Sequence, residues 1–357
     1  MLIRKLKLII PVACLLIAGA LFGQEIRKEG RDFVSTIEKT FTVGSGGTLT
    51  MRNVQGDVTV ISWDKNSVEI KEGIRMDVHT RDEAEKIVER SKASYSQTGN
   101  AITVDGRQSR RYEEHKYWIS LPRKFNLDIK TRGGDITVDD LDGELELNTS
   151  GGDIELSKIK GRIDFRTSGG DIDLRNIDAP VRGRTSGGNI DLEDLKGISN
   201  LRTSGGSISL RRAAEEVTVS TSGGDIDIED VSADVEATTS GGSIEASNCK
   251  GRVRLNTSGG NIRLTSMGGP VRGHTSGGDI DGSGFADEID LSTSGGDIEL
   301  RDVQAAVEAS TSGGNIEVEM TITEFSKPHG VSLTTSGGDI EILLPEKLPA
   351  KIIAEIR

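Results

Sequence analysis

The hexapeptide Thr-Ser-Gly-Gly-Asp-Ile begins at Thr149, and variants of it return every 18 residues as far as Thr311. An earlier variant begins at Thr131, and a last copy at Thr335 follows after six extra residues, which makes twelve copies. Self-similarity at a fixed short period is typical of folds that grow by stacking near-identical units. We therefore expect a repeat architecture and not a globular domain around one central core.

Each unit, numbered from its threonine, carries apolar side chains at fixed positions. Position six is isoleucine in every copy, and positions eight, eleven, fifteen and seventeen are apolar in most, as in Ile154, Leu156, Ile159, Ile163 and Phe165. Two pairs of apolar residues at period two indicate two strands, each with one buried face, and exclude a helix here. We predict an all-β chain, a single-stranded parallel β-helix or β-solenoid with 18-residue coils.

The glycine pairs at positions three and four predict one corner of each coil. They include Gly151, Gly152, Gly169, Gly170, Gly223 and Gly224. We expect these glycines to adopt backbone angles closed to most other residues. Threonine at position one has inward parity, so stacked threonines should form a hydroxyl ladder with hydrogen bonds to the coils above and below. Cys249 falls at position eleven, the opposite corner, and is expected to be a small core residue instead of a reactive thiol.

The N-terminus reads as an export signal. Residues 1–23 place Arg4, Lys5 and Lys7 before the apolar run Leu8–Phe22. Lipidation at Cys14 is a weaker alternative, and the membrane would be met only through this segment if it were retained. The sequence therefore predicts an exported protein in the periplasm, on the outer surface or outside the cell.

The rest of the chain divides into three parts. Residues 24–130 predict a β-rich cap region with one short helix at 81–94, which Thr80 and Glu83 should cap. Residues 131–344 are the solenoid, with an extra loop at 320–330, and residues 345–357 form a tail or second cap.

The aromatic residues and the order of segments add to this interpretation. Trp63, Trp118 and all three tyrosines lie in the cap region, where we expect them to pack a small β core, with ligand stacking as an alternative. The segment Asn53–Val60 looks like a worn copy of the repeat.

Along the chain, Phe41-Thr-Val is followed by Asn53-Val-Gln-Gly-Asp-Val, Ser62-Trp-Asp, the helix, Ile119-Ser-Leu-Pro and the repeats. This order resembles the bacterial adhesin-candidate family of Toastrack-type β-solenoid domains, over about residues 33–344. The resemblance implies a secreted or envelope-attached β-solenoid of undetermined function.

Positions five and seven form outward columns of acidic residues. The weak calcium candidates among them are Asp153, Asp171, Asp173, Asp225, Asp227, Asp279 and Asp281. Calcium could neutralise such a ladder with oxygen ligands. However, the repeat motif supplies one Gly-Gly per coil, and Asn189, Asn261 and Ser207 interrupt the column. We favour a solvated acidic face in which the acid after Gly-Gly hydrogen-bonds the turn, and we assign no metal ligands.

Basic residues gather on the outward face of the second strand. A possible interaction patch comprises Arg162, Arg166, Arg182, Arg184 and Arg202, and a later group comprises Arg252, Arg254, Arg272 and His274. An acidic face beside basic patches would also allow rods to associate side by side.

Composition narrows the function. A net charge of −13 argues against a nucleic-acid partner, and aromatic side chains make up only 3% of the chain, so sugar-stacking platforms are scarce. The four histidines lack metal spacing, and no catalytic residue or cofactor is indicated. We predict a non-catalytic, adhesin-like interaction or scaffold module for an unknown protein or glycan at the cell surface or envelope. The alternatives are a carbohydrate-active or polysaccharide-binding β-helix and a calcium-stiffened rod.

Overall fold

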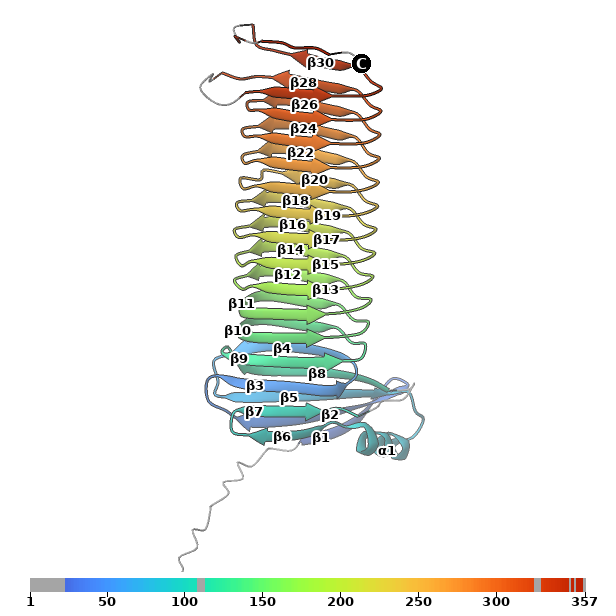
Figure 1. Ribbon diagram of the computed structural model, residues 1–357. Coiled ribbons are helices and arrows are strands. Elements are labelled where there is room, and N and C mark those ends of the chain that lie inside the picture. The colour runs from blue at the N-terminus through green and yellow to red at the C-terminus, as the bar shows by residue number, and fades with distance from the viewer. Residues whose placement is uncertain (1–22, 108–112, 324–328, 347, 350, 356–357) are drawn as a thin grey trace, which may run out of the picture.

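The computed structural model describes residues 23–107, 113–323, 329–346, 348–349 and 351–355. The chain forms a tall stack of short strands, with the β-rich cap region and its helix at one end and the C-terminus at the other (Figure 1). The predicted all-β solenoid is therefore confirmed. The predicted export signal lies outside the described residues except for Gly23, where the first strand begins.

The cap region contains nine strands and one helix among its described residues. The strands are β1 (Gly23–Glu29), β2 (Asp32–Thr42), β3 (Gly47–Val54), β4 (Asp57–Trp63), β5 (Ser67–Met76), β6 (Ser94–Thr98), β7 (Ala101–Asp105), β8 (Glu113–Pro122) and β9 (Phe125–Thr131), and the helix is α1 (Arg81–Ser91). Antiparallel pairing joins β1, β2, β5 and β8 in one stack and β6 with β7 in another. Parallel strands β4 and β3 continue these two stacks toward the solenoid.

The solenoid extends both stacks. Its first coils are the long strands β10 (Ile136–Asn148) and β11 (Ile154–Arg166), which run through both sides. One stack then contains β12 (Ile172–Ile177), β14 (Ile190–Leu195), β16 (Ile208–Ala213), β18 (Ile226–Val231), β20 (Ile244–Ser247), β22 (Ile262–Met267), β24 (Ile280–Phe285), β26 (Ile298–Val303), β28 (Ile316–Met320) and β30 (Ile340–Leu343). The other contains β13 (Val181–Arg184), β15 (Ser199–Arg202), β17 (Val217–Ser220), β19 (Val235–Thr238), β21 (Val253–Asn256), β23 (Val271–His274), β25 (Ile289–Ser292), β27 (Val307–Ser310) and β29 (Val331–Thr334). Within the solenoid every neighbouring pair is parallel, and equivalent residues lie in register except for a shift near the end of β26 and β28, where Val303 pairs with Met320.

The worn repeat at Asn53–Val60 is a real part of the stack. Val58 in β4 lies in register with Ile136 in β10. The Thr131 hydroxyl donates to the Gly56 carbonyl at 3.1 Å, as later threonines donate to later glycines. The cap region thus presents a near-copy of a coil, on which the first true coil stacks.

The core follows the predicted inward positions. Position-six isoleucines from Ile136 to Ile316 are at most 1% exposed, and one apolar cluster runs from the cap region through the solenoid. Cys249 is fully buried in it. Because each coil covers its apolar face only against its neighbours, the stack is stable as a whole and not coil by coil.

Threonine at position one is buried as expected, but the hydroxyl ladder is not made of threonines. The Thr167 hydroxyl donates to the carbonyl of Gly152 in the coil below at 2.9 Å, and accepts the N–H of Gly170 in its own coil at 3.3 Å. The same pair of bonds recurs in the following coils. Each threonine therefore ties two glycine corners together through their backbone groups.

The reason for glycine at position four differs from the prediction. None of the repeat's Gly-Gly residues has a positive φ. Instead, a Cβ at Gly170 would lie 1.9 Å from the Gly152 carbonyl oxygen, and the position-four glycines of the other repeats show nearly the same conflict, at 1.9–2.2 Å. Position three is open, since a Cβ at Gly169 would meet nothing closer than 3.6 Å. Glycine is needed for close approach between coils and not for its backbone angles.

The left-handed backbone lies at position ten, which the sequence pattern did not single out. Asp140, Lys158, Asn176, Asp194 and Asp230 have φ between 56° and 60° there. This residue is skipped in the strand pairing, so the next one, at position eleven, turns inward. Asn and Asp tolerate this conformation better than most residues, which accounts for their frequency at position ten.

Position five forms a ladder of side-chain-to-backbone hydrogen bonds. Asp153 Oδ1 accepts the N–H of Asp171 at 2.7 Å, and Asp171 Oδ1 accepts that of Asn189 at 2.7 Å. Where the column holds asparagine or serine, the same bond persists, as from Ser207 N–H to Asn189 Oδ1 at 2.9 Å. The position-five side chain was predicted to hydrogen-bond the backbone of its own turn. It does accept a backbone N–H, but that N–H belongs to the next coil. Any short side chain with an acceptor oxygen satisfies it.

Helix α1 and the aromatic residues differ from the expectations in detail. The predicted capping box between Thr80 and Glu83 is present, but the helix ends at Ser91 because the Ala93 N–H is held by the Glu72 carboxylate. Tyr117 is buried, whereas Trp118 is 45% exposed, so the expectation that both tryptophans pack the core is wrong. Strand alternation cannot bury both neighbours.

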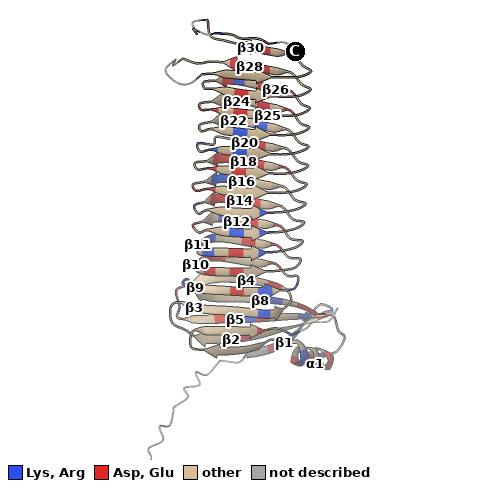
Figure 2. Cartoon of the chain, viewed as in Figure 1, with Lys and Arg blue, Asp and Glu red and all other residues tan. Residues whose placement is uncertain are grey.

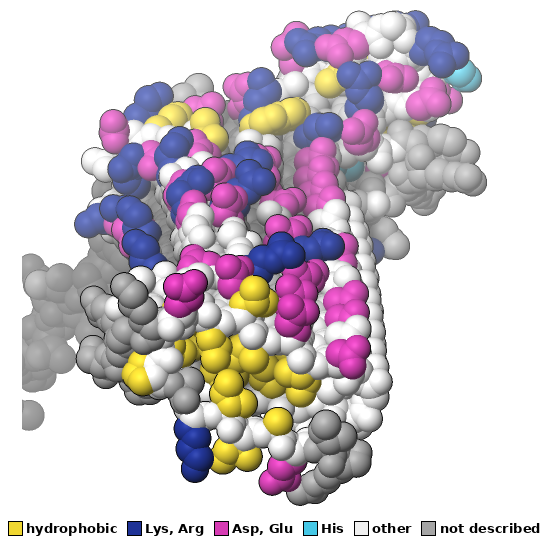
Figure 3. Space-filling view, turned by 90° about the horizontal axis from the view of Figure 1, so that it is seen from above, with side chains coloured by type: hydrophobic (Ala, Val, Ile, Leu, Met, Phe, Trp, Pro, Cys, Tyr) yellow, Lys and Arg dark blue, Asp and Glu magenta, His cyan; other side chains and the backbone are white. Residues whose placement is uncertain are grey.

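The C-terminal end is the least covered part of the solenoid. After the extra residues, Thr335 again donates to the Gly314 carbonyl, at 2.8 Å, so the register is restored. On the last coil, Ile340 is 45% exposed and Leu343 46%, and Figure 3 shows hydrophobic side chains gathered on that end. Within the described ranges, no helix combines the length and apolarity that crossing a bilayer requires.

Replacing Gly170 by alanine should lower the free energy of unfolding by about 1–3 kcal/mol or more, because the new Cβ forces the Gly152 carbonyl away. Gly169→Ala is the matched control and should be nearly neutral. Urea unfolding of the two variants measures the difference, and equal losses would contradict the close-approach explanation.

Replacing Asp171 by alanine should speed hydrogen exchange at the Asn189 amide, because its acceptor is lost. Asp171→Asn keeps an acceptor oxygen and should leave that amide protected, as natural Asn189 does for Ser207. Amide exchange followed by NMR reports on this single site. Fast exchange in both variants would show that the charge, and not the acceptor, is required.

Candidate functional site

A cleft of about 860 Å³ lies on the outer face of β9, β10, β11, β13 and β15. Its floor is the sheet itself, at residues such as Leu127, Leu145 and Gly183. All members of the predicted interaction patch line it, namely Arg162, Arg166, Arg182, Arg184 and Arg202. We call this feature, with these five residues, the arginine cleft.

The fold aligns three of these arginines in a column. Arg166, Arg184 and Arg202 occupy position eighteen of successive coils, and the parallel register places Arg184 directly between the other two. Neighbouring strands lie about 4.8 Å apart, so the side chains start close together. Like charges directly opposite one another in a sheet are destabilising.

Few carboxylates balance this column. Arg162 pairs with Asp164 at 3.1 Å, and Arg202 donates to the Ser220 hydroxyl at 2.8 Å. Arg166, Arg182 and Arg184 have no ion pair within the described part of the chain. At the lower end of the cleft, by contrast, Lys130 already bridges Asp128 and Glu146, at 3.1 and 3.3 Å.

Most arginines of the solenoid outside the cleft are paired, and within the described residues only Arg132 and Arg254 are exceptions. In the later basic group, Arg272 contacts Asp290 at 2.7 Å and Arg252 contacts Asp234 at 3.6 Å. Charges of both signs recur along the whole stack (Figure 2). The arginine cleft therefore differs from the other basic positions because it gathers several arginines without ion pairs at one place.

The calcium candidates are not brought together as a metal site. Within the residues that the structure describes, no three His, Cys, Asp or Glu side chains are placed to hold a metal ion. Asp153, Asp171, Asp225 and Asp279 each accept a backbone N–H of the next coil.

The remaining calcium candidates lie at position seven. Partial burial, reinforced by neighbouring carboxylates and opposed by nearby arginines, raises the pKa of Asp173, Asp227 and Asp281. Arginines such as Arg175, beside Asp173, reduce the charge of this column.

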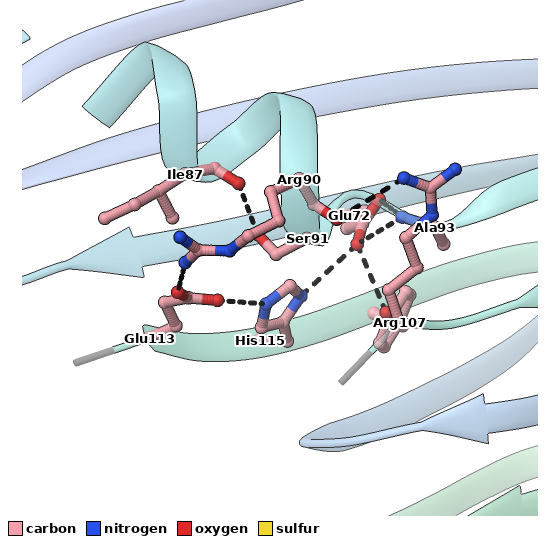
Figure 4. A network of polar contacts seen from close by, with 9 residues as sticks. Glu72, Ile87, Arg90, Ser91, Ala93, Arg107, Glu113 and His115 are labelled. Carbon is pink, nitrogen blue, oxygen red and sulfur yellow. Dashed lines mark hydrogen bonds and ion pairs between the residues drawn. The ribbon is translucent and has the colours of Figure 1, made fainter. Parts of the chain in front are cut away.

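The cap region contains a buried polar network that was not predicted from the sequence (Figure 4). The Glu72 carboxylate accepts the hydroxyls of Tyr95 and Tyr117, at 2.6 and 3.2 Å, and the N–H of Ala93, at 3.2 Å. His115 Nδ1 lies 3.3 Å from it. Burial, and then the charge of Glu72, raise the pKa of both tyrosines.

The network joins the end of α1 to β5, β6 and β8, and its second carboxylate, Glu113, pairs with Arg90 of the helix. Glu72 and His115 are buried, so we interpret the network as structural. The sequence contains an indication of this network. Along β5, Glu72 occupies an inward-facing position, between the buried residues Ile70 and Ile74.

Cys249 is not a reactive site. Burial raises the pKa of its thiol to about 11. At neutral pH the thiol is therefore protonated, and the thiolate that reacts with electrophiles is scarce.

A sequence profile of the family described as Toastrack DUF4097 matches residues 48–248 and 215–357. No curated protein matches the chain significantly. Several solved structures are similar, including the following three. A candidate adhesin from Bacteroides fragilis is 15% identical, with a TM-score of 0.28, and the match covers 86% of this chain and 97% of that one.

The other two come from Parabacteroides distasonis. A candidate lipid-binding protein is 13% identical, with a TM-score of 0.23, covering 86% and 96% of the two chains. A candidate adhesin is 11% identical, with a TM-score of 0.20, covering 86% and 97%. At these values the three structures carry no argument about a ligand.

Replacing Glu72 by glutamine should lower the free energy of unfolding by roughly 3 kcal/mol, because it removes the charge that the buried His115 and two tyrosines surround. Glu69→Gln, on the same strand but facing outward, is the control and should change little. Urea unfolding followed by the fluorescence of the cap-region tryptophans measures both. A neutral Glu72→Gln would show that the network contributes no stability.

Proposed function

This chain belongs to the Toastrack DUF4097 family, and we propose on that basis that it is a non-catalytic interaction module of the cell surface or envelope. The observation that carries the proposal is the arginine cleft, where four of the five arginines have no ion pair in the described part of the chain, on a protein of net charge −13. A chain that gained only solubility from its charges would place them next to opposite charges, as Arg252 and Arg272 are in the later coils. An uncompensated cluster in a concave surface favours binding.

The regularity of the solenoid supports a binding role over a catalytic one. A catalytic site needs a few side chains of different chemistry held at one place. Here one column repeats the same guanidinium on three successive coils, which provides several equal contacts for an extended partner. We propose that export, by way of residues 1–23, brings this surface to its partner in the periplasm, at the outer surface or outside the cell.

The full chain, labelled and purified, should bind intact cells or envelope fractions of its source organism. The variant Arg166→Gln/Arg184→Gln/Arg202→Gln should lose most of this binding, because it removes the whole column. Arg252→Gln/Arg254→Gln/Arg272→Gln carries the same change in net charge on the same side of the rod and is the control. Binding assays on cells and fractions measure both.

Failure of the unaltered chain to bind any fraction would contradict the interaction role. Equal loss in both variants would contradict the arginine cleft as its location. Turnover of an envelope polysaccharide by the purified chain would overturn the non-catalytic proposal.

A further inference from the structure

We infer that the arginine cleft binds a linear acidic polysaccharide, with the acid groups of the ligand lying along the rod axis. This inference rests on the proposed interaction role and adds the chemistry of the ligand. It depends on three features of the cleft: the spacing of its charges, its neutral polar residues and the carboxylates that border it.

The charge column suits a linear anion. Arg166, Arg184 and Arg202 stand in register on β11, β13 and β15, so their guanidinium groups start from points about 4.8 Å apart in a line. Guanidinium groups bind carboxylate and sulfate-like anions through two parallel N–H bonds. An anion placed between neighbouring arginines would relieve their mutual repulsion, and a chain bearing several acid groups would do so along the whole column.

Neutral polar side chains extend the same columns. Asn148 lies below Arg166 at position eighteen, and Asn200 lies beside Arg182 at position sixteen. Both line the cleft, and neither side chain makes a hydrogen bond within the described residues. An amide offers both donors and an acceptor, which matches the hydroxyl groups of a sugar. Arginine with asparagine therefore fits a ligand that alternates acid groups with hydroxyls.

The borders of the cleft disfavour larger anionic surfaces. Glu144 and Glu146 lie at its lower end, and Asp164 lies within it, in register with Arg182 and paired with Arg162. Above it, Glu216 and Asp234 are exposed on the same face. The positive segment spans only three coils, so a nucleic-acid duplex or a bilayer would also meet these carboxylates. The nearest aromatic ring, that of Phe165, is only 5% exposed and offers no platform for a base.

Isothermal titration of the full chain with matched probes tests the inference. The probes are a sulfated hexasaccharide, a hexasaccharide of uronic acid, an uncharged maltohexaose and an oligothymidylate with a similar number of charges. We expect the two acidic sugars to bind, more weakly as salt is raised, and the uncharged sugar and the oligothymidylate to bind much less.

Two substitutions locate the site. Arg184→Gln removes the central charge and should weaken binding of the acidic sugars about tenfold, the effect of losing one charge-assisted contact. Arg254→Gln is the control, because Arg254 is also exposed but lies in register with Glu236, and it should leave affinity unchanged. Both side chains are on the surface, and circular dichroism verifies that the variants fold.

Each other outcome counts against the inference. If the oligothymidylate binds as tightly as the acidic sugars, binding depends only on the charge of the ligand and not on its sugar chemistry. Equal losses in Arg184→Gln and Arg254→Gln would place binding elsewhere. If no acidic sugar binds although the chain still binds envelope fractions, the polysaccharide is wrong and the interaction role stands. If the chain binds neither the acidic sugars nor the envelope fractions, both the polysaccharide inference and the interaction role are wrong.

Discussion

The stack depends on one close contact, where the position-four glycine of each coil lies against the carbonyl of its counterpart one coil below. No side chain fits in that gap, as the conflict at Gly170 shows. The buried threonine donates to the same carbonyl, and the position-five oxygen accepts the N–H of the next coil. These polar contacts fix the vertical register, and the register then aligns the apolar positions into one continuous core. Burial supplies the stability, but the corner decides how the coils are aligned.

A fixed register turns every outward position into a column, so a charge repeated in the sequence becomes a charge stacked in space. The acidic columns are tolerated because arginines stand beside them and because their oxygens have backbone partners. The column of Arg166, Arg184 and Arg202 has no ion pair in the described residues, and only Arg202 has a hydrogen-bond partner, the Ser220 hydroxyl. We therefore expect a binding site where stacked side chains of one charge lack partners of the opposite charge.

The cap region obeys different rules because it has no period. Antiparallel strands replace parallel ones, which lets the stack end in strands that continue no further coil. Glu72 holds the end of α1 and three strands through one buried carboxylate. A buried charge of this kind requires all its partners at once, which explains why the aromatic residues of this region serve a polar network as well as a core.

The sequence by itself determined the coil length, the two strands per coil, the inward positions and the membership of the arginine cleft, because a strict period makes neighbours in space from residues one period apart. It could not determine what the glycines avoid, since that depends on the distance between coils. The period places Asp290 beside Arg272 and Asp164 beside Arg182, but it could not show that the first two form an ion pair whereas Asp164 pairs with Arg162 instead. In the cap region, the sequence wrongly predicted Trp118 to be buried and did not identify Glu72 as a buried carboxylate. Only the packing of β5, β8 and α1 decides which face of these strands is buried. The sequence shows which residues stack one period apart, whereas only the folded structure shows which charged side chains pair.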